Sequence, residues 1–196
     1  ARFDSDYSAS RDAAYGELSF AASDRLTLIA GLRAERFSAD YDDSLNVEVT
    51  PGDTLLGGQL SAQYALNDAA MVYAQVSRGF KAGGVNGEAI GKARQAALSP
   101  SIISFLEGRR EFSSEVLWNY EIGWKSTLMN NRVVFNGAIY QVKWDNAQSG
   151  IFAPQAGFGN LTVSVNGPSY ETKGIQMSLS ARATENLTID AAASYN

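Results

Sequence analysis

Residues 117–145 decide the fold, and they read LWNYEIGWKSTLMNNRVVFNGAIYQVKWD. The first half shows the clearest alternation between apolar and polar side chains: Trp118, Tyr120, Ile122, Trp124 and Leu128 against Asn119, Glu121, Gly123, Lys125 and Thr127. A period of two residues is the signature of a β-strand with one apolar face. The Asn130-Asn131 pair that follows is typical of a tight turn, so the stretch predicts a β-hairpin.

The second strand of this hairpin, residues 132–145, alternates less regularly. In its first half, apolar residues such as Val133 and Val134 occupy both faces. A β-bulge or an apolar patch facing a plug domain explains this, and the sequence leaves both open. Beyond Tyr140 the pattern is regular and predicts one apolar and one polar face: Val142 and Trp144 against Gln141, Lys143 and Asp145.

The same alternation recurs along the chain and predicts about eight strands. They are expected at residues 12–22, 25–37, 54–66, 70–80, 117–129, 132–145, 171–183 and 187–196. The connections between them alternate in length without exception. Short Asn- and Asp-rich turns lie at 23–25, 67–69, 130–131 and 184–186, and long segments at 38–53, 81–116 and 146–169. Short periplasmic turns and long outer loops are typical of a transmembrane β-barrel.

Aromatic side chains gather beside the long connections. They are Phe37, Phe80, Trp118, Tyr120, Trp144 and Tyr170. An amphipathic ring is most stable at the headgroup level of a bilayer, so we expect these residues to form an interfacial belt. The polar strand faces, with charges such as Arg33, Glu35 and Lys143, are then expected to face a hydrated or plugged lumen.

Composition excludes several classes of function. The chain has 196 residues, no cysteine, no histidine, a net charge of -5 and a mean hydropathy of -0.17. The absence of histidine removes the commonest metal ligand and general base, and we predict no catalytic site, no metal site and no cofactor. The negative charge argues against nucleic acid as a partner. No apolar run is long enough for a transmembrane helix, which is compatible with barrel strands.

Two stretches carry a family resemblance, VYAQVSRGFKAGGVN at 72–86 and SSEVLWNYEIGWKSTLMNNRVVFNGAIYQVKWDNAQ at 113–148. Together they resemble the barrel of TonB-dependent outer-membrane receptors. The matching motif positions are Gly79, Phe80, Lys81, Gly83, Gly84, Asn86, Glu115, Asn119, Tyr120, Glu121, Gly123 and Lys125. We expect Gly79, Gly83 and Gly84 to adopt positive φ, and Glu121 and Lys125 to face the lumen, where they pair with neighbouring strands or with a plug.

The resemblance implies an all-β, antiparallel, up-and-down barrel of roughly 22 strands in the bacterial outer membrane, of which this chain supplies about eight. Residues 1–196 are then a partial barrel domain without the plug domain or the remaining strands. The implied function is uptake of a scarce small molecule, such as an iron-siderophore complex, cobalamin or a glycan. The implied partners are outer-membrane lipid, the plug domain of the parent chain and the TonB inner-membrane energising complex.

Two alternatives remain open from the pattern alone: a self-contained small barrel and a diffusion porin.

The ligand-contacting residues are expected in the outer loops 38–53, 81–116 and 146–169, since long loops commonly carry function. Within the longest loop, residues 92–110 have the pattern of a short amphipathic helix. The chain opens without a signal peptide and closes inside a strand pattern, so we expect it to be a piece of something longer.

Overall fold

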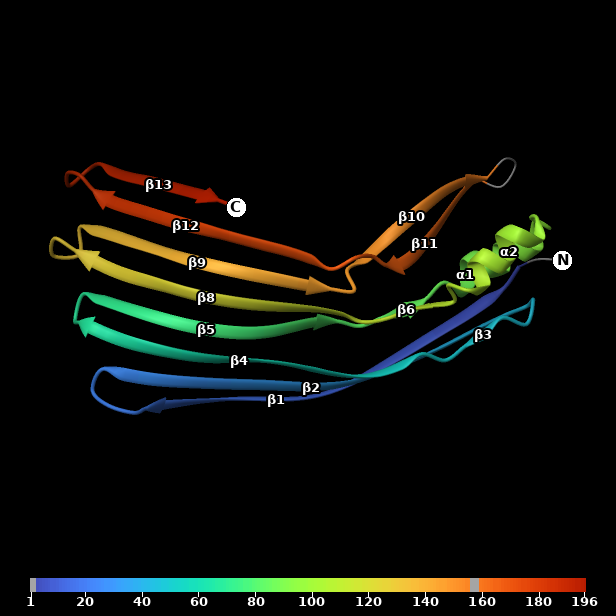
Figure 1. Ribbon diagram of the computed structural model, residues 1–196, viewed down its shortest axis with the longest axis horizontal. Helices are drawn as coiled ribbons and strands as arrows, with labels where there is room; N and C mark the ends of the chain where they lie inside the picture. Colours follow the sequence, from blue (N-terminus) through green and yellow to red (C-terminus); the bar gives the residue numbers. More distant parts are fainter. Residues whose placement is uncertain (1–2, 156–158) are drawn as a thin grey trace.

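One antiparallel sheet dominates the computed structural model, which describes residues 3–155 and 159–196. Its strand order is β1-β2-β4-β5-β8-β9-β12-β13, with the two-residue β3 paired to β2 outside this path (Figure 1). The strands are β1 (Ser5–Ala21), β2 (Leu26–Asp43), β3 (Glu48–Val49), β4 (Gly52–Asn67), β5 (Ala70–Lys81), β8 (Glu115–Leu128), β9 (Val133–Asp145), β12 (Tyr170–Arg182) and β13 (Thr188–Tyr195). Long strands that are consecutive in the chain are neighbours in the sheet, which confirms the up-and-down arrangement.

The predicted strands are all present, but the first hairpin is longer than expected. Strand β1 begins at Ser5 rather than at residue 12, and β2 continues to Asp43 instead of ending at residue 37. Their register is continuous from Ser5↔Asp43 to Ala21↔Thr27. The sequence did not predict this extension because the added residues are rich in serine and aspartate and show no apolar alternation. The hydrogen-bonded ladder nevertheless continues through them.

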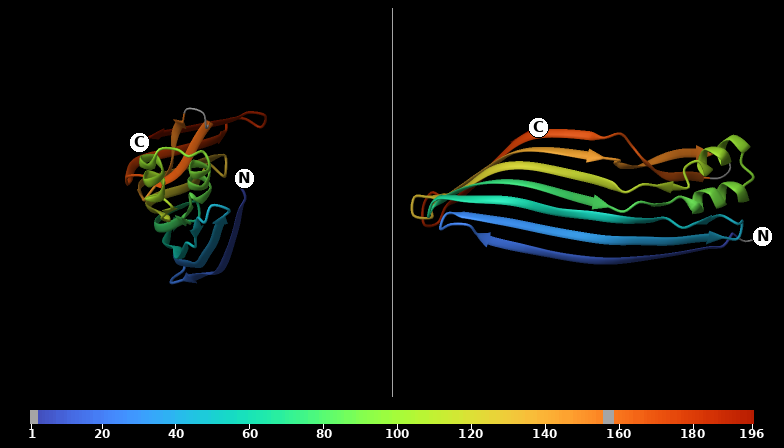
Figure 2. Two further views of the ribbon diagram at one scale, coloured as in Figure 1. Left: turned by 90° about the vertical axis from the view of Figure 1, so that its right-hand side faces the viewer. Right: turned by 60° about the horizontal axis from the view of Figure 1, so that its bottom comes forward.

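Short turns and long connections lie at opposite ends of the sheet, as the sequence predicted (Figure 1). At the short-turn end Met129, Asn130 and Asn131 all have positive φ, which asparagine tolerates well. Among the described residues of the sheet, the one shift in register lies between Ala65 and Asn67, beside the short turn from β4 to β5. The end-on view shows the sheet curved across its strands, with β1 and β13 as its two edges (Figure 2).

The second half of β9 faces opposite to the sequence prediction. Its pairing with β8 and β12 contains no bulge and joins Trp118 to Lys143, Tyr120 to Gln141 and Tyr140 to Glu121. Since paired residues share a face, Gln141 and Lys143 lie on the apolar face, and Val142 and Trp144 lie on the polar one. The predicted lumen position of Lys143 is therefore wrong. The irregular first half of β9 had concealed the true phase of the strand.

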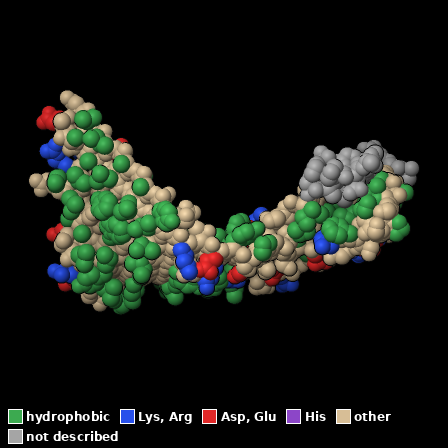
Figure 3. Space-filling model, turned by 45° about the horizontal axis from the view of Figure 1, so that its top comes forward, with side chains coloured by type: hydrophobic (Ala, Val, Ile, Leu, Met, Phe, Trp, Pro, Cys, Tyr) green, Lys and Arg blue, Asp and Glu red, His purple; other side chains and the backbone are tan. Residues whose placement is uncertain are grey.

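The two faces of the sheet differ in chemistry and in crowding. The apolar face is open, with Ile122 65% exposed and Leu60 59% exposed, whereas Glu35, Ser61 and Ala138 on the polar face are 5%, 9% and 2% exposed. Apolar side chains gather over the part of the sheet near the short turns, with charged groups on either side of them (Figure 3). This apolar band is the pattern that a lipid-facing barrel wall requires.

The long connections contain secondary structure of their own. Between β5 and β8 lie β6 (Gly84–Val85), α1 (Gly87–Gln95), α2 (Pro100–Glu107) and β7 (Glu111–Phe112). Between β9 and β12 lie β10 (Gln148–Gln155) and β11 (Gly159–Asn166), which form a hairpin. The predicted helix at 92–110 is two short helices, separated near Ala97, which has a positive φ. None of the helices among the described residues is long and apolar enough to cross a membrane.

Candidate functional site: the loop cap and the polar wall

The three long connections meet in one cluster beyond the sheet, which we call the loop cap (Figure 2). Its buried core combines the end of β2, β3, α1, α2 and β11. The core residues are Tyr41, Val47, Val49, Ala89, Ile90, Ala93, Leu106 and Val163. Burial of this apolar area holds the three connections together. The predicted candidate loops 38–53, 81–116 and 146–169 therefore form one structural unit.

Asn86 is the polar link at the centre of the loop cap. Its side-chain amide donates to the carbonyl oxygens of Arg109 (2.8 Å) and Ser164 (2.7 Å), and its Oδ1 accepts from the amide of Ser164 (2.9 Å). Asn86 is 8% exposed, so these bonds are made away from water. A buried side-chain amide with its hydrogen-bonding groups satisfied fixes the geometry of the segments around it. Asn86 thus locks the second connection to the third.

Arg94 joins the two helices to the first connection. Its guanidinium donates to Glu107 on α2 (2.6 Å) and to the carbonyl oxygen of Leu45 (3.2 Å). The hydrogen bond from Arg94, together with the charges of Arg94 and Arg110, lowers the pKa of Glu107. Glu107 therefore stays ionised over a wider pH range than a free glutamate, and the contact between the helices persists with it.

A second set of polar contacts ties the loop cap to the strands below it. The amide of Gln148 donates to Glu115 (2.6 Å), and the Gln148 side chain donates to the carbonyl oxygen of Ala82 (2.8 Å). Asn166 accepts from the amide of Ser113 (2.6 Å) and donates back to its carbonyl oxygen (2.8 Å). The β10–β11 hairpin is thereby bound to the point where β5 and β8 leave the sheet.

The first group of motif residues shapes this junction. Lys81 pairs with Glu115 at 3.9 Å, and Phe80 packs beside the buried cluster of Phe37, Ala39, Leu55 and Ala82. The expectation of positive φ at the motif glycines is wrong, because none of them has it. A side chain on Gly83 would instead lie 2.1 Å from the carbonyl oxygen of Phe112, and one on Gly84 would meet the Phe112 ring. These glycines permit close approach of two segments.

The second group of motif residues lies on β8, with Asn119, Glu121, Gly123 and Lys125 on the polar face and Tyr120 on the apolar face, as the alternation predicted. Glu121 accepts a hydrogen bond from Tyr73 on β5 (2.5 Å), and Asn119 lies 3.4 Å from the other oxygen of Glu121. The Lys125 ammonium lies 5.7 Å from the centre of the Tyr73 ring. Gly123 leaves room for the same ring, since a Cβ there would be 2.5 Å from it. Tyr120 lies on the apolar face and stacks on Trp118.

A second polar network lies on the same face across β1, β2 and β4. Glu35 is paired with Arg33 and lies 4.0 Å from Arg11, and Gln59 donates to Glu17 (2.8 Å). Together with Tyr73 and Glu121 these groups line the crowded side of the sheet. We call this face, from β1 to β12, the polar wall. It offers carboxylates, guanidinium groups and hydroxyls to a hydrated interior.

The aromatic residues do not form one belt. Trp118 and Tyr120 lie on the apolar face, with ring centres 6.2 Å apart, as an interfacial belt requires. Phe37 is 3% exposed and packs in the buried cluster with Phe80. Trp144 and Tyr170 contact each other at 6.0 Å on the polar-wall side. Sequence position beside a long loop therefore did not determine which way a ring faces.

The sequence had not pointed to Gln148, Ser164, Asn166 or Tyr73. The Asn86–Ser164 contact joins residues 78 positions apart, and no local pattern reports a contact of that range. Across the described residues, no group of three or more His, Cys, Asp or Glu side chains is placed to hold a metal ion. The described residues of the loop cap and polar wall present polar side chains and loop backbone groups that can bind a ligand.

Comparison with known proteins agrees with this architecture. The chain matches the family described as "TonB dependent receptor-like, beta-barrel" over residues 1–196. The chain therefore belongs to the TonB-dependent receptor β-barrel family, whose solved relatives described below are receptors and transporters rather than enzymes.

Three solved structures illustrate the fold. The ferric yersiniabactin uptake receptor FyuA from Yersinia pestis is 21% identical with a TM-score of 0.68, and the match covers 98% of this chain and 28% of that one. The copper transporter OprC is 19% identical with a TM-score of 0.71, covering 97% and 30%. The siderophore receptor PiuA from Acinetobacter baumannii is 17% identical with a TM-score of 0.69, covering 98% and 26%. The chain thus spans under a third of the length of each.

Proposed function

We propose that this chain forms part of the wall and outer loops of a bacterial outer-membrane receptor that imports a scarce ligand with energy from the TonB system. Two observations support the proposal: the family match over the whole chain, and a loop cap that lies at one end of the polar wall. In the complete protein, ligand binds first at the loop cap and then passes along the wall beside a plug domain.

The ligand class that we favour is an iron-siderophore complex, with cobalamin or a glycan as the other candidates. Siderophore receptors recur among the solved relatives, although one relative is a copper transporter. The loop cap supports a selective receptor better than a diffusion porin. It is held by buried hydrogen bonds at Asn86 and by an apolar core, which suits preorganised recognition more than an open passage.

Transport is tested in bacteria that lack the gene and carry the full-length protein on a plasmid. Uptake of radiolabelled ferric siderophores, cobalamin and oligosaccharides is measured with TonB present and deleted. We expect saturable uptake of one ligand class that disappears without TonB. Replacing residues 87–107 with a short Gly-Ser linker is expected to abolish uptake. Replacing the turn 184–186 with Asn-Gly is the matched control and is expected to leave uptake unchanged.

Passive, unsaturable entry of small hydrophilic solutes without TonB would overturn the proposal in favour of a porin. So would full ligand uptake by the variant that lacks residues 87–107, because the loop cap would then have no part in recognition.

A further inference from the structure

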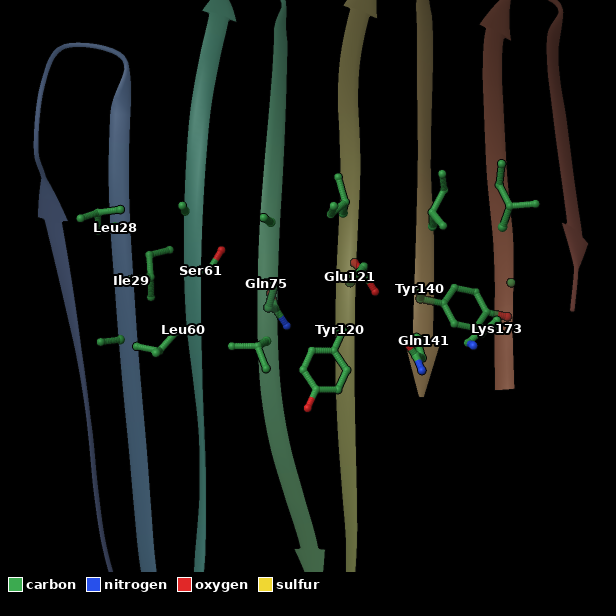
Figure 4. Close-up of a pocket in the computed structure, with 18 of the residues that line it drawn as sticks. Leu28, Ile29, Leu60, Ser61, Gln75, Tyr120, Glu121, Tyr140, Gln141 and Lys173 are labelled. Carbon is green, nitrogen blue, oxygen red and sulfur yellow. The ribbon is translucent and has the colours of Figure 1, made fainter. Parts of the chain in front are cut away.

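Several charged side chains lie on the apolar face of the sheet, at the edge of the apolar band nearest the long connections. We call Arg78, Trp118, Gln141, Lys143, Glu171 and Lys173 the boundary patch. Their shared face follows from the pairing of Arg78 with Trp118, of Trp118 with Lys143, and of Lys143 with Glu171. Gln141 and Lys173 pair with each other one register row nearer the short turns. Leu60, Tyr120, Gln141 and Lys173 lie along that row in Figure 4.

Charge within the boundary patch is only partly balanced. Glu171 accepts from Gln141 (2.7 Å) and pairs with Lys173 (2.8 Å), and the charge of Lys143 also acts on it, so one carboxylate serves two lysines. Arg78 and Lys143 flank Trp118 on the two neighbouring strands, and the Arg78 guanidinium lies 5.8 Å from the Trp118 ring. The buried Nη1 of Arg78 has no hydrogen-bond partner among the described residues. The nearest outward-facing acid beyond them, Asp145, lies one register row further toward the loops.

The spacing of these two basic residues suits a single phosphate. Backbones two strands apart in a sheet are separated by about 10 Å, which two long side chains can close around one anion. Guanidinium and ammonium groups are the preferred protein ligands of phosphate. A stacked Trp118–Tyr120 pair beside them places amphipathic rings at the level where headgroups begin.

An apolar depression adjoins the boundary patch on the side of the apolar band. Leu32, Gly58, Leu60, Val76, Arg78 and Trp118 line it. Gly58 forms its floor, because a Cβ there would lie 2.4 Å from the carbonyl oxygen of Gly31. The depression runs into the open apolar face, so one occupant can place hydrocarbon against the leucines and an anion between Arg78 and Lys143.

We infer that the boundary patch binds a phosphorylated glycolipid of the outer leaflet, with phosphate held between Arg78 and Lys143 and acyl chain in the depression at Gly58. This assignment concerns the outer surface of the barrel and is independent of the transported ligand. It explains why basic groups occur on a face that is otherwise apolar, at the depth where a lipid supplies the missing anion.

The inference is tested by native mass spectrometry of the full-length protein in detergent, titrated with diphosphorylated lipid A or with its dephosphorylated form. We expect the wild type to prefer the phosphorylated lipid. The double variant Arg78→Gln/Lys143→Gln is expected to lose that preference and to bind phosphorylated lipid A about tenfold or more weakly. The single variant Lys143→Gln, which leaves the Arg78–Trp118 contact intact, is expected to show a smaller loss.

The matched control Arg25→Gln/Lys92→Gln removes two positive charges outside the boundary patch and is expected to bind as the wild type does. Folding of each variant's barrel is checked by heat modifiability, the change in its gel mobility between unheated and boiled samples. Equal binding of both lipids by the wild type would overturn the inference. The inference would also be overturned if the folded Lys143→Gln variant and the folded double variant both kept the full preference for phosphorylated lipid, or if the control lost as much binding as the double variant. A dimer mass in place of the lipid-bound mass would overturn it too, because a second protein copy would then cover this face.

Discussion

At the scale of single residues, several residues of the family motif bind the long connections to each other and to the strands. Gly83 makes room for the backbone of Phe112 and Gly84 for its ring, and Asn86 bonds Arg109 of its own connection and Ser164 of the third. Glu115 accepts from Gln148. These residues hold the loop cap in place by steric fit and hydrogen bonding. Their role is therefore measurable through stability, separately from transport.

Replacing Gly83 with alanine is expected to loosen the loop cap. A Cβ at this position would lie 2.1 Å from the carbonyl oxygen of Phe112, so the β6–β7 contact must shift at a cost of about 1–3 kcal/mol. Limited proteolysis of the full-length protein measures the change as faster cleavage within 81–116. Gly79→Ala is the matched control, because a Cβ there meets nothing within 4 Å. Equal cleavage of the two variants would contradict this explanation.

Replacing Asn86 with aspartate is expected to separate the second and third connections. The substitution keeps the size of the side chain but turns its two donor bonds, to Arg109 and Ser164, into contacts between oxygens. The expected cost is about 2–4 kcal/mol. Hydrogen exchange should rise in both α1 and β11. The exposed Asn186→Asp is the control, and unchanged exchange in the Asn86 variant would refute the proposed link.

At the scale of elements, the sequence predicted the long strands but not the internal structure of the loops. Period-two alternation identified β4, β5, β8 and β12 nearly to their ends. It missed the start of β1, whose residues are exposed throughout, and the whole β10–β11 hairpin, of which Val163 is buried only by contacts with distant parts of the chain. The helix predicted at 92–110 is divided into α1 and α2, whose packing depends on partners elsewhere in the chain.

Acidification is expected to weaken the α1–α2 contact through Glu107. Its pKa lies below the ordinary value of 4.5, so the Arg94 contact contributes its full stabilisation above that value. The contribution is lost as the pH falls through the lowered pKa. Hydrogen exchange of α1 and α2 measured against pH should show this loss in the wild type.

The Glu107→Gln variant provides the comparison for the pH experiment. It is expected to exchange faster than the wild type at neutral pH and to converge with it in acid. Glu88→Gln removes the exposed pair with Lys92 and leaves the Arg94–Glu107 contact, so its pH profile should follow the wild type. A wild-type profile that stays flat on acidification would contradict the role of Glu107.

At the scale of the whole molecule, the sheet separates lipid from interior by its two faces. The open face carries the apolar band and the boundary patch, and the crowded face carries the polar wall. The sheet is curved across its strands (Figure 2), and the chain matches under a third of a larger receptor, so we propose that it is an arc of a wide barrel. Under that proposal, the strand edges at β1 and β13 pair with neighbouring strands of the barrel.

A charge placed on the open face is expected to cost much more than one on the polar wall. Ile122→Lys puts an ammonium group into the apolar band, at about 2–4 kcal/mol. Gln75→Lys is the matched control on the neighbouring strand. It faces the other side and pairs in register with Glu121 (Figure 4), so it should be nearly neutral. Urea unfolding of the full-length protein in liposomes measures both, and similar losses would contradict the assignment of the faces.

The sequence by itself determined the class of fold, the eight long strands, the short turns, the ends at which short and long connections lie, and the family motif. These are local properties, written in side-chain alternation and in turn residues such as Asn130 and Asn131. Only the tertiary structure decided the face on which Lys143 and Trp144 lie and the union of three loops through Asn86, Arg94 and a shared apolar core. Those features depend on strand register and on contacts between residues far apart in the chain. A shift of one residue reverses a face, and no local pattern fixes that choice.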